Sequence, residues 1–197
     1  MTELPRDELP GDEPLGGEVF LRTERLVLRR FTAADVDNLV ELDSDPDVMR
    51  YLSGGRPTPR EVIAERVLPA ILDNYRRLGG LGWWAAEFTG EFAGWLGLRP
   101  PAADRLDEAE LGYRLRKPFW GRGLATEGCR ALLRKAFTEL GIRRVYAQTM
   151  AVNTASRRVL EKSGLVHTRT FHQHFDDPIP GTHLGEVEYE LHAPFLS

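Results

Sequence analysis

The chain has 197 residues, the size of one domain, and its apolar content of 42% is sufficient for a full hydrophobic core. Its net charge is -4 and its sequence pI is about 5.8, so the composition gives no global basis for nucleic-acid binding. The single cysteine, Cys129, excludes an intramolecular disulfide and a multi-cysteine zinc site. Because free cysteine is usually buried, we expect Cys129 to be a structural thiol on a helix.

The N-terminal segment contains acids, prolines and glycines but no apolar core segment. We expect residues 1–18 to be a disordered acidic tail and residues 19–197 to form a single domain. The segment resembles neither a signal peptide nor a transit peptide, and no run of ~18 apolar residues predicts a membrane span. We therefore expect a cytoplasmic protein that binds neither membrane nor nucleic acid.

A strand and two helical stretches are predicted in the N-terminal half. Alternation indicates a strand over residues 26–31, and Thr32 followed by Asp35 is typical of a helix N-terminus. A second helical pattern covers residues 59–78. Pro69 lies inside it and predicts a kink or a split, because proline lacks an N–H group and crowds the preceding turn.

The second half alternates between strand and helix patterns. Two aromatic-rich runs around a Thr-Gly-Glu turn predict a β-hairpin, and the strongest amphipathic helix of the chain comes later. The predicted fold class is α/β, a mixed and mainly antiparallel sheet flanked by helices. The expected strands are 81–88, 92–98, 110–115, 144–149, 165–171 and 187–191, and the expected helices are 124–140 and 153–162.

A glycine turn joins the strand 110–115 to the strongest helix. Gly121 and Gly123 allow a tight turn whose N–H groups lie at a helix N-terminus, where free donors and the helix dipole favour anions. The turn is surrounded by basic side chains, which predicts a phosphate site; the plain alternative is a tight strand-to-helix turn without a ligand. The basic residues are Arg114, Arg116, Lys117 and Arg122.

Two other phosphate-binding turns are disfavoured by the residues present. A P-loop needs Gly-Lys followed by Ser or Thr, and that sequence is absent. A dinucleotide-binding turn needs Gly or Ala where Thr126 stands and an acid near Gln148 or Thr149, at the end of the next strand. A nucleotide-dependent oxidoreductase or kinase is therefore a disfavoured hypothesis for this chain.

Three segments together resemble one family. They are LRTERLVLRRF (residues 21–31), WGRGLATE (residues 120–127) and NTASRRVLEKSG (residues 153–164). In this order and spacing they resemble the GCN5-related N-acetyltransferase (GNAT) superfamily, and most of all its branch of ribosomal-protein N-terminal acetyltransferases. The resemblance implies the GNAT fold, acetyl-CoA as cofactor, and direct acetyl transfer to a primary amine in a ternary complex. It is also compatible with a homodimer.

The resemblance assigns the cofactor contacts. The strand residues Tyr113, Arg114 and Leu115 are expected to pair with the pantetheine arm, and the Leu115 N–H to bind the thioester oxygen, on which negative charge develops. Asn153 is expected to contact the same arm in addition to capping the following helix. The family's pyrophosphate loop matches Trp120, Gly121, Arg122, Gly123, Leu124 and Ala125, with Thr126 as a further backbone donor and Trp120 replacing the usual Gln or Arg.

The proton-transfer groups are less clearly indicated. The resemblance implies Ser156 as the acid that protonates the departing thiolate, against a plain role as a capping or solvent-facing side chain. Glu110, on the strand that carries Leu115, is the first choice for the base. Further candidates are Glu87, His167, His172 and His174, each of which is equally explained as a structural or solvated residue. No metal site is expected, because His172 and His174 lack a third ligand.

The acceptor is the least determined part. A small-molecule or peptide amine is expected, in a pocket shaped by residues 45–59 and 171–184. The rival hypothesis is a non-catalytic acyl-CoA-binding sensor or scaffold on the same fold. The nearby acids are candidates to attract an amine, although charge runs are usually solvated: Glu41, Asp43, Asp45 and Asp47.

Overall fold

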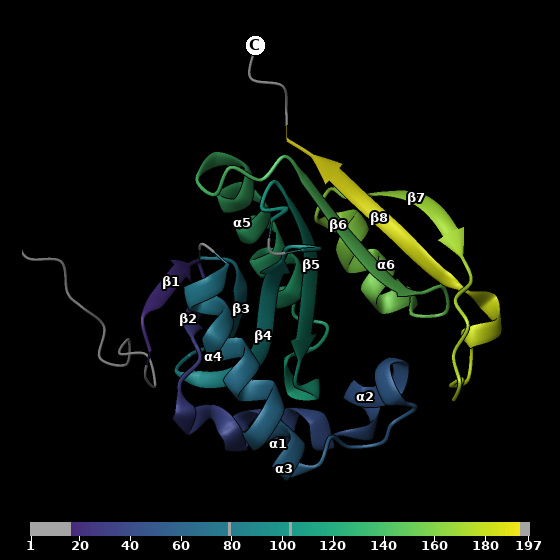
Figure 1. Cartoon of the computed structure of the whole chain (residues 1–197), viewed down its shortest axis with the longest axis horizontal. Helices are drawn as coiled ribbons and strands as arrows, with labels where there is room; N and C mark the ends of the chain where they lie inside the picture. Colours follow the sequence, from purple (N-terminus) through teal and green to yellow (C-terminus); the bar gives the residue numbers. More distant parts are fainter. Residues whose placement is uncertain (1–16, 79, 103, 194–197) are drawn as a thin grey trace, which may run out of the picture.

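The computed structural model describes residues 17–78, 80–102 and 104–193. One eight-stranded sheet runs through the molecule in the order β1-β2-β3-β4-β5-β6-β8-β7, and its strands are antiparallel except for the parallel pair β5 and β6 (Figure 1). The predicted fold class is therefore confirmed. Most of the predicted acidic tail, residues 1–16, lies outside the described residues.

The strands agree with the predicted ones within a few residues. The predicted hairpin is present, and Thr89 and Gly90 form its turn with φ of 52° and 76°. A short edge strand, β1, was not predicted, because four residues are too few for a clear alternation. The strands are β1 Val19–Arg22, β2 Leu26–Arg30, β3 Gly82–Phe88, β4 Glu91–Arg99, β5 Glu108–Leu115, β6 Arg144–Met150, β7 Val166–Phe171 and β8 Glu186–His192.

The helices after β2 start where the sequence predicts, but they include one that it did not predict. Thr32 and Asp35 form a complete capping box, ahead of α1 (Val36–Ser44). A separate helix, α2 (Pro46–Ser53), follows at once: the Asp45 side chain caps it, and Pro46 fits its first turn. This helix was not predicted from the sequence.

Pro69 splits the next helical stretch in the predicted way. The stretch consists of α3 (Arg60–Val62), a π-helical turn (Ile63–Val67) and α4 (Leu68–Arg77). The N–H of Leu68 reaches the carbonyl of Ile63, five residues back. The wider turn accommodates the proline ring, which would collide with a carbonyl of a regular helix.

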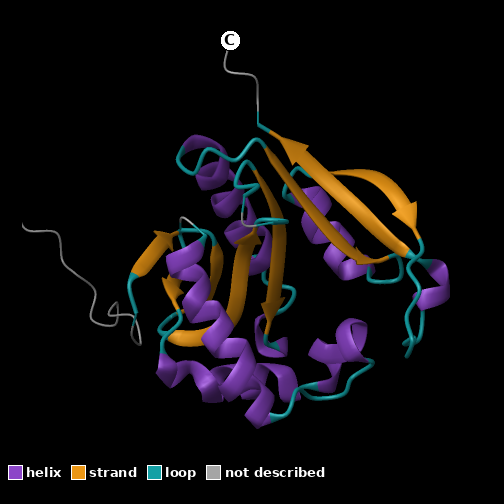
Figure 2. Cartoon of the chain, viewed as in Figure 1, coloured by secondary structure: helices purple, strands orange, loops and turns teal. Residues whose placement is uncertain are grey.

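The helices cover opposite faces of the sheet. In Figure 2, α4 crosses in front of the left half of the sheet and α1 and α3 lie at its lower end, whereas α5 (Leu124–Thr138) and α6 (Thr154–Lys162) lie behind the sheet. Two hydrophobic clusters result, a larger one under α5 and α6 and a smaller one under α1 to α4. Cys129 lies in the larger cluster and is fully buried, as expected. Burial raises the pKa of its thiol, which makes it an inert structural group.

A buried ion cluster ties β2, β3 and the start of the first helix together. The Arg29 guanidinium donates two hydrogen bonds to Asp35, at 2.9 and 2.8 Å, and one to Glu87, at 2.6 Å. All three side chains are at most 3% exposed. Burial acts to raise the pKa of Asp35, but the hydrogen bonds from Arg29, Thr32 and Asn38 outweigh it, so the pKa lies below its usual value.

We expect Asp35→Ala to destabilise the fold by about 3–5 kcal/mol in urea unfolding, because it leaves the buried Arg29 charge without its bidentate partner. Asp37→Ala is the control: its carboxylate pairs with Arg60 on the surface and is 79% exposed, so we expect a change within about 0.5 kcal/mol. Since the pKa of Asp35 is lowered, its contribution is present above the unfolded value near pH 4 and is lost as the pH falls. Equal effects of the two substitutions would contradict this role.

Candidate active site

The sheet opens between β5 and β6. Their parallel pairing is limited to Glu108 with Arg144, Ala109 with Val145 and Glu110 with Tyr146, after which the strands diverge toward their C-terminal ends (Figure 1). The backbone N–H of Arg116 donates to the Ala93 carbonyl of β4 at 2.9 Å.

Successive N–H groups of an extended chain point to opposite sides. Since the Arg116 N–H points to β4, the N–H groups of Leu115 and Tyr113 point toward the opening, as the predicted oxyanion and pantetheine contacts require.

The glycine turn has the geometry of an anion site. Gly121 and Gly123 have φ of 71° and 78°, in the left-handed region, and Gly123 precedes the first residue of α5. A Cβ at Gly121 would meet nothing within 4 Å, so the backbone at that point is open to a ligand. Gly123 and Thr126 line a cavity, so the start of the 15-residue helix, with its free N–H groups, lies beside accessible space.

Trp120 has a contact that the sequence did not indicate. Its indole Nε1 donates to the Leu115 carbonyl at 2.7 Å, while the ring remains 45% exposed. The peptide between Leu115 and Arg116 is thus held on both sides, because the Arg116 N–H is bonded to Ala93. The tryptophan at the first loop position therefore fixes the end of β5.

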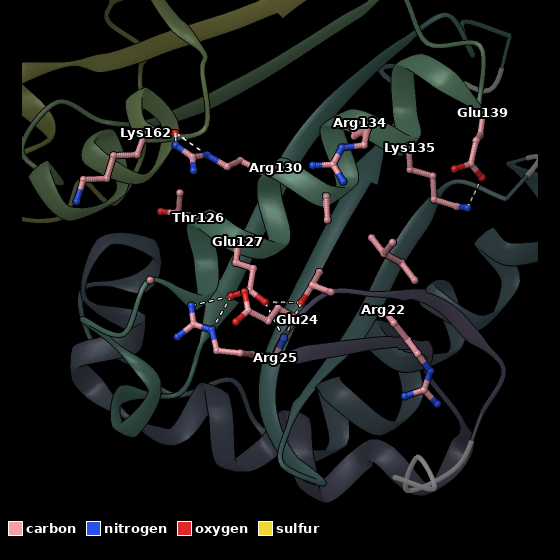
Figure 3. Close-up of a pocket in the computed structure, with 14 residues that line it drawn as sticks. Arg22, Glu24, Arg25, Thr126, Glu127, Arg130, Arg134, Lys135, Glu139 and Lys162 are labelled. Carbon is pink, nitrogen blue, oxygen red and sulfur yellow. Dashed lines mark hydrogen bonds and ion pairs between the residues drawn. The ribbon is translucent and has the colours of Figure 1, made fainter. Parts of the chain in front are cut away.

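Two of the segments that carried the family resemblance meet in space. Glu127 of α5 accepts from the Thr23 hydroxyl at 2.5 Å and from the Arg25 backbone N–H at 2.9 Å (Figure 3). The Arg25 side chain bonds Glu127 at 2.6 Å and donates to the Arg122 carbonyl inside the glycine turn at 3.0 Å. Burial acts to raise the pKa of Glu127, but these hydrogen bonds lower it below its usual value. The turn between β1 and β2 therefore supports the glycine turn.

The basic patch is a correction to the sequence analysis. Three of its side chains do not face the glycine turn but pair with acids of α1 and α2: Arg114 with Asp43, Arg116 with Glu41, and Lys117 with Asp47 at 2.5 Å. The fourth, Arg122, lies over the Phe88 ring, 4.4 Å from its centroid. These cations and acids neutralise each other, so neither set is a bare site for phosphate or amine.

Asn153 and Ser156 lie at the start of α6, as predicted. The Asn153 side chain accepts from the Ser156 N–H at 3.2 Å, which confirms its capping role. The Ser156 hydroxyl lies 2.8 Å from the Tyr113 hydroxyl of β5, which also contacts the Ser156 carbonyl at 3.0 Å. Tyr113 and Ser156, 43 residues apart in sequence, thus meet beside the opening.

The predicted bases occupy different environments. Glu110 is 26% exposed and pairs with Arg99 at 2.5 Å, at the closed end of β5. Glu87 belongs to the buried cluster with Arg29 and lies outside the opening. Glu186, not considered from sequence, pairs in register with Met150 at the diverged end of β6. Burial raises the pKa of Glu186, which brings its carboxyl closer to the range for proton transfer.

The three candidate histidines separate as well. His167 stacks edge-on against Tyr189 of β8, with ring centroids 5.4 Å apart, which gives it a structural contact. His172 and His174 lie in the exposed segment after β7, where His174 is 92% exposed.

The two segments expected to shape the acceptor pocket are in contact. Arg56, after α2, pairs with Asp177 of the loop between β7 and β8 at 2.7 Å. A Cβ at Gly54 would lie 3.1 Å from the Ile179 side chain, so the chains pack closely there. Within the described ranges, no group of three or more His, Cys, Asp or Glu residues is placed to hold a metal, and no helix is long and apolar enough to cross a membrane.

Comparisons with known proteins identify the family. The Acetyltransferase (GNAT) domain model matches residues 25–166. The FsC-acetyl coenzyme A-N(2)-transacetylase of Aspergillus fumigatus is 39% identical over 178 residues, covering 87% of this chain and 75% of that protein. A crystal structure of a probable acetyltransferase has a TM-score of 0.73 and 26% identity, covering 86% of this chain and 94% of the other.

The fold of RimL, the ribosomal L7/L12 alpha-N-protein acetyltransferase solved with coenzyme A, is similar at 20% identity. Its TM-score is 0.73, and the match covers 89% of this chain and 98% of that one. The chain belongs to the GNAT acetyltransferase family. It is an acetyl-CoA-dependent N-acetyltransferase, and the open glycine turn at the start of α5 fits the phosphates of that cofactor.

We expect Gly123→Val to weaken CoA binding at least tenfold in calorimetry. A β-branched residue is strained at φ of 78° and would turn the N–H groups of the loop away from the phosphates. Gly141→Val is the matched control, because Gly141 has φ of 70° and follows the far end of α5. A Cβ at Gly141 would meet nothing within 4 Å, and one at Gly123 would meet only the Arg25 side chain in ordinary contact at 3.6 Å. The two variants should lose similar stability, and only the first should lose CoA. An unchanged CoA affinity in Gly123→Val would contradict the assignment of the glycine turn as the phosphate site.

Proposed function

We propose that this N-acetyltransferase moves acetyl directly from acetyl-CoA to the primary amine of a small molecule, in a ternary complex. The observation that carries this is the convergence of three elements on one opening: the Leu115 edge of β5, the glycine turn and the start of α6. The relative named for N(2) transfer to FsC, at 39% identity, favours a small-molecule nitrogen over a protein N-terminus. A cytoplasmic location and a homodimer stay predictions.

In this proposal positioning supplies much of the rate. The amine nitrogen attacks the thioester carbon, and negative charge moves to the carbonyl oxygen. The Leu115 N–H donates a hydrogen bond to that oxygen. The strand edge formed by Tyr113, Arg114 and Leu115 pairs with the pantetheine arm. The contacts of Trp120 and Arg116 fix the peptide that follows Leu115 and so keep this donor in one direction.

We assign the acceptor's proton to Glu110, with Glu186 as the second carboxylate. Glu110 lies five residues before Leu115, about 16 Å along an extended strand, so it acts through water rather than by direct contact. Its carboxylate forms an ion pair with Arg99 at 2.5 Å. Glu186 lies at the diverged end of the opening instead.

We assign the leaving group's proton to Ser156. The hydroxyl is at the N-terminus of α6, where its position is fixed by the Asn153 cap and by Tyr113. A free thiol has a pKa near 8.5, so the thiolate needs only modest help from an acid. The effect of removing Ser156 should therefore be a decrease in turnover rather than its loss.

The nucleotide end of the cofactor has a basic pocket next to the glycine turn. A cavity of about 660 Å³ is lined by Gly123 and Thr126 of the turn and by residues of α5, α6 and the β1–β2 turn (Figure 3). Its lining includes Arg130, whose side chain bonds the Lys162 carbonyl at 2.9 Å, and Arg134. Among the described residues, no hydrogen bond or ion pair holds the Arg134 guanidinium, which leaves it available to a phosphate.

A panel of amines with acetyl-CoA tests the proposed transfer. We expect thiol release and acetylation with small-molecule amines such as polyamines and aminoglycosides, and little with peptide N-termini. Transfer to peptides alone would make the acceptor a protein N-terminus. CoA binding without transfer to any amine would instead support the sensor hypothesis, and Ser156→Ala should then change nothing.

We expect Arg134→Met to weaken CoA binding about three- to tenfold, because it removes a charge-assisted contact at a solvated site. Dephospho-CoA, which lacks the 3′-phosphate, should lose less affinity in the same variant. Arg76→Met is the control, since Arg76 lies on α4 and is 79% exposed, away from the pocket. Equal losses for both ligands would place the 3′-phosphate elsewhere.

A further inference from the structure

Tyr113 has a partly buried polar side chain that the proposed reaction does not yet use. The sequence analysis gave it only a backbone role, but its side chain extends from β5 to α6. Its hydroxyl has two neighbours, the Ser156 carbonyl at 3.0 Å and the Ser156 hydroxyl at 2.8 Å. Burial, and to a smaller degree the neighbouring Cys129, raises the pKa of Tyr113, so the phenol stays protonated and remains a hydrogen-bond donor.

The number of protons limits the hydrogen bonds that the hydroxyls of Tyr113 and Ser156 can form with each other. A phenol has one proton, and a serine hydroxyl has one. When the Tyr113 proton points to the Ser156 oxygen, the serine proton is free to point elsewhere, toward the opening between β5 and β6. When it points to the Ser156 carbonyl, the serine proton is directed to the phenol oxygen instead. Tyr113 thus selects between two orientations of the Ser156 hydroxyl.

We propose that Tyr113 is a positioning residue for the acid Ser156, directing the serine proton to the CoA sulfur and stabilising the oxygen that gives it up. This rests on the proposed role of Ser156. As the new C–N bond forms and the C–S bond breaks, the electron pair passes to sulfur. The proton of the Ser156 hydroxyl moves to that sulfur, the amine proton passes to the base, and Ser156 recovers a proton from solvent. Tyr113 keeps its own proton throughout and donates a hydrogen bond to the Ser156 oxygen.

The backbone makes the arrangement stiff. Asn153 accepts from the Ser156 N–H, which fixes the first turn of α6, and Tyr113 is anchored in a strand that pairs with β4. The backbone of Ser156 is therefore held by Asn153, and its hydroxyl has Tyr113 as a partner. A hydroxyl with one fixed partner loses less rotational freedom in the transition state than a free one.

The test is a double-mutant cycle of Tyr113→Phe and Ser156→Ala, with kcat, the KM for acetyl-CoA, CoA affinity and Tm measured for each. Tyr113→Phe should lower kcat about fivefold, the effect of one net hydrogen bond, with CoA affinity and KM unchanged. In the Ser156→Ala background, Tyr113→Phe should cause no further decrease, because its effect passes through the serine.

Tyr75→Phe is the matched control. The Tyr75 hydroxyl is also partly buried and bonds backbone groups, accepting from the Phe31 N–H at 3.0 Å and donating to the Trp83 carbonyl. This variant should lower Tm and leave kcat unchanged. It shows what a purely structural phenol does when its hydroxyl is removed.

The results distinguish a failure of the Tyr113 role from a failure of Ser156 as the acid. If Ser156→Ala has wild-type turnover, the acid role fails and the Tyr113 role fails with it. A decrease in Ser156→Ala with wild-type kcat in Tyr113→Phe overturns the inference alone. Multiplicative effects of the two substitutions, or a Tyr113→Phe effect on Tm and CoA affinity without one on kcat, also overturn it.

Discussion

The parallel pairing of β5 with β6 ends after three residue pairs, and the chemistry of the molecule depends on that limit. A continuous ladder would consume the N–H groups of Tyr113 and Leu115 in sheet hydrogen bonds. Because the strands diverge, these donors face an opening that an extended ligand can enter as a further strand. The same divergence leaves room for Ser156, at the start of α6, to approach β5 through Tyr113.

The site is held together by contacts between distant segments. Arg25 ties the turn between β1 and β2 to the Arg122 carbonyl and to Glu127, while Trp120 ties the loop to the end of β5. Glycine gives the loop its conformation but no rigidity, since glycine is the most flexible residue in the unfolded chain. The side chains around it therefore supply the order that backbone recognition of a phosphate needs.

The local signals in the sequence predicted the fold well, because the elements concerned are specified by their own residues. The capping box at Thr32, the turn at Thr89 and Gly90, and the Asn153 cap need no distant partner. The helix α2 was missed because its eight residues are too few for a repeated apolar spacing, and its start signal is only Asp45 before a proline. The edge strand β1 was missed for the same reason of length.

The prediction of a basic patch around the glycine turn was wrong, and the reason is physical. Arg114 lies 71 residues from its partner Asp43, so the sequence shows a basic segment and an acidic segment but not their mutual neutralisation. Once paired, these groups hold α1 and α2 against the C-terminal end of β5 and the residues that follow it. The proposed cofactor half of the site uses backbone groups. Their direction follows from secondary structure, so the sequence is sufficient to make a prediction about them. The acceptor half, as proposed, would draw on side chains from α2 and the loop after β7, and its character depends on which long-range pairs form.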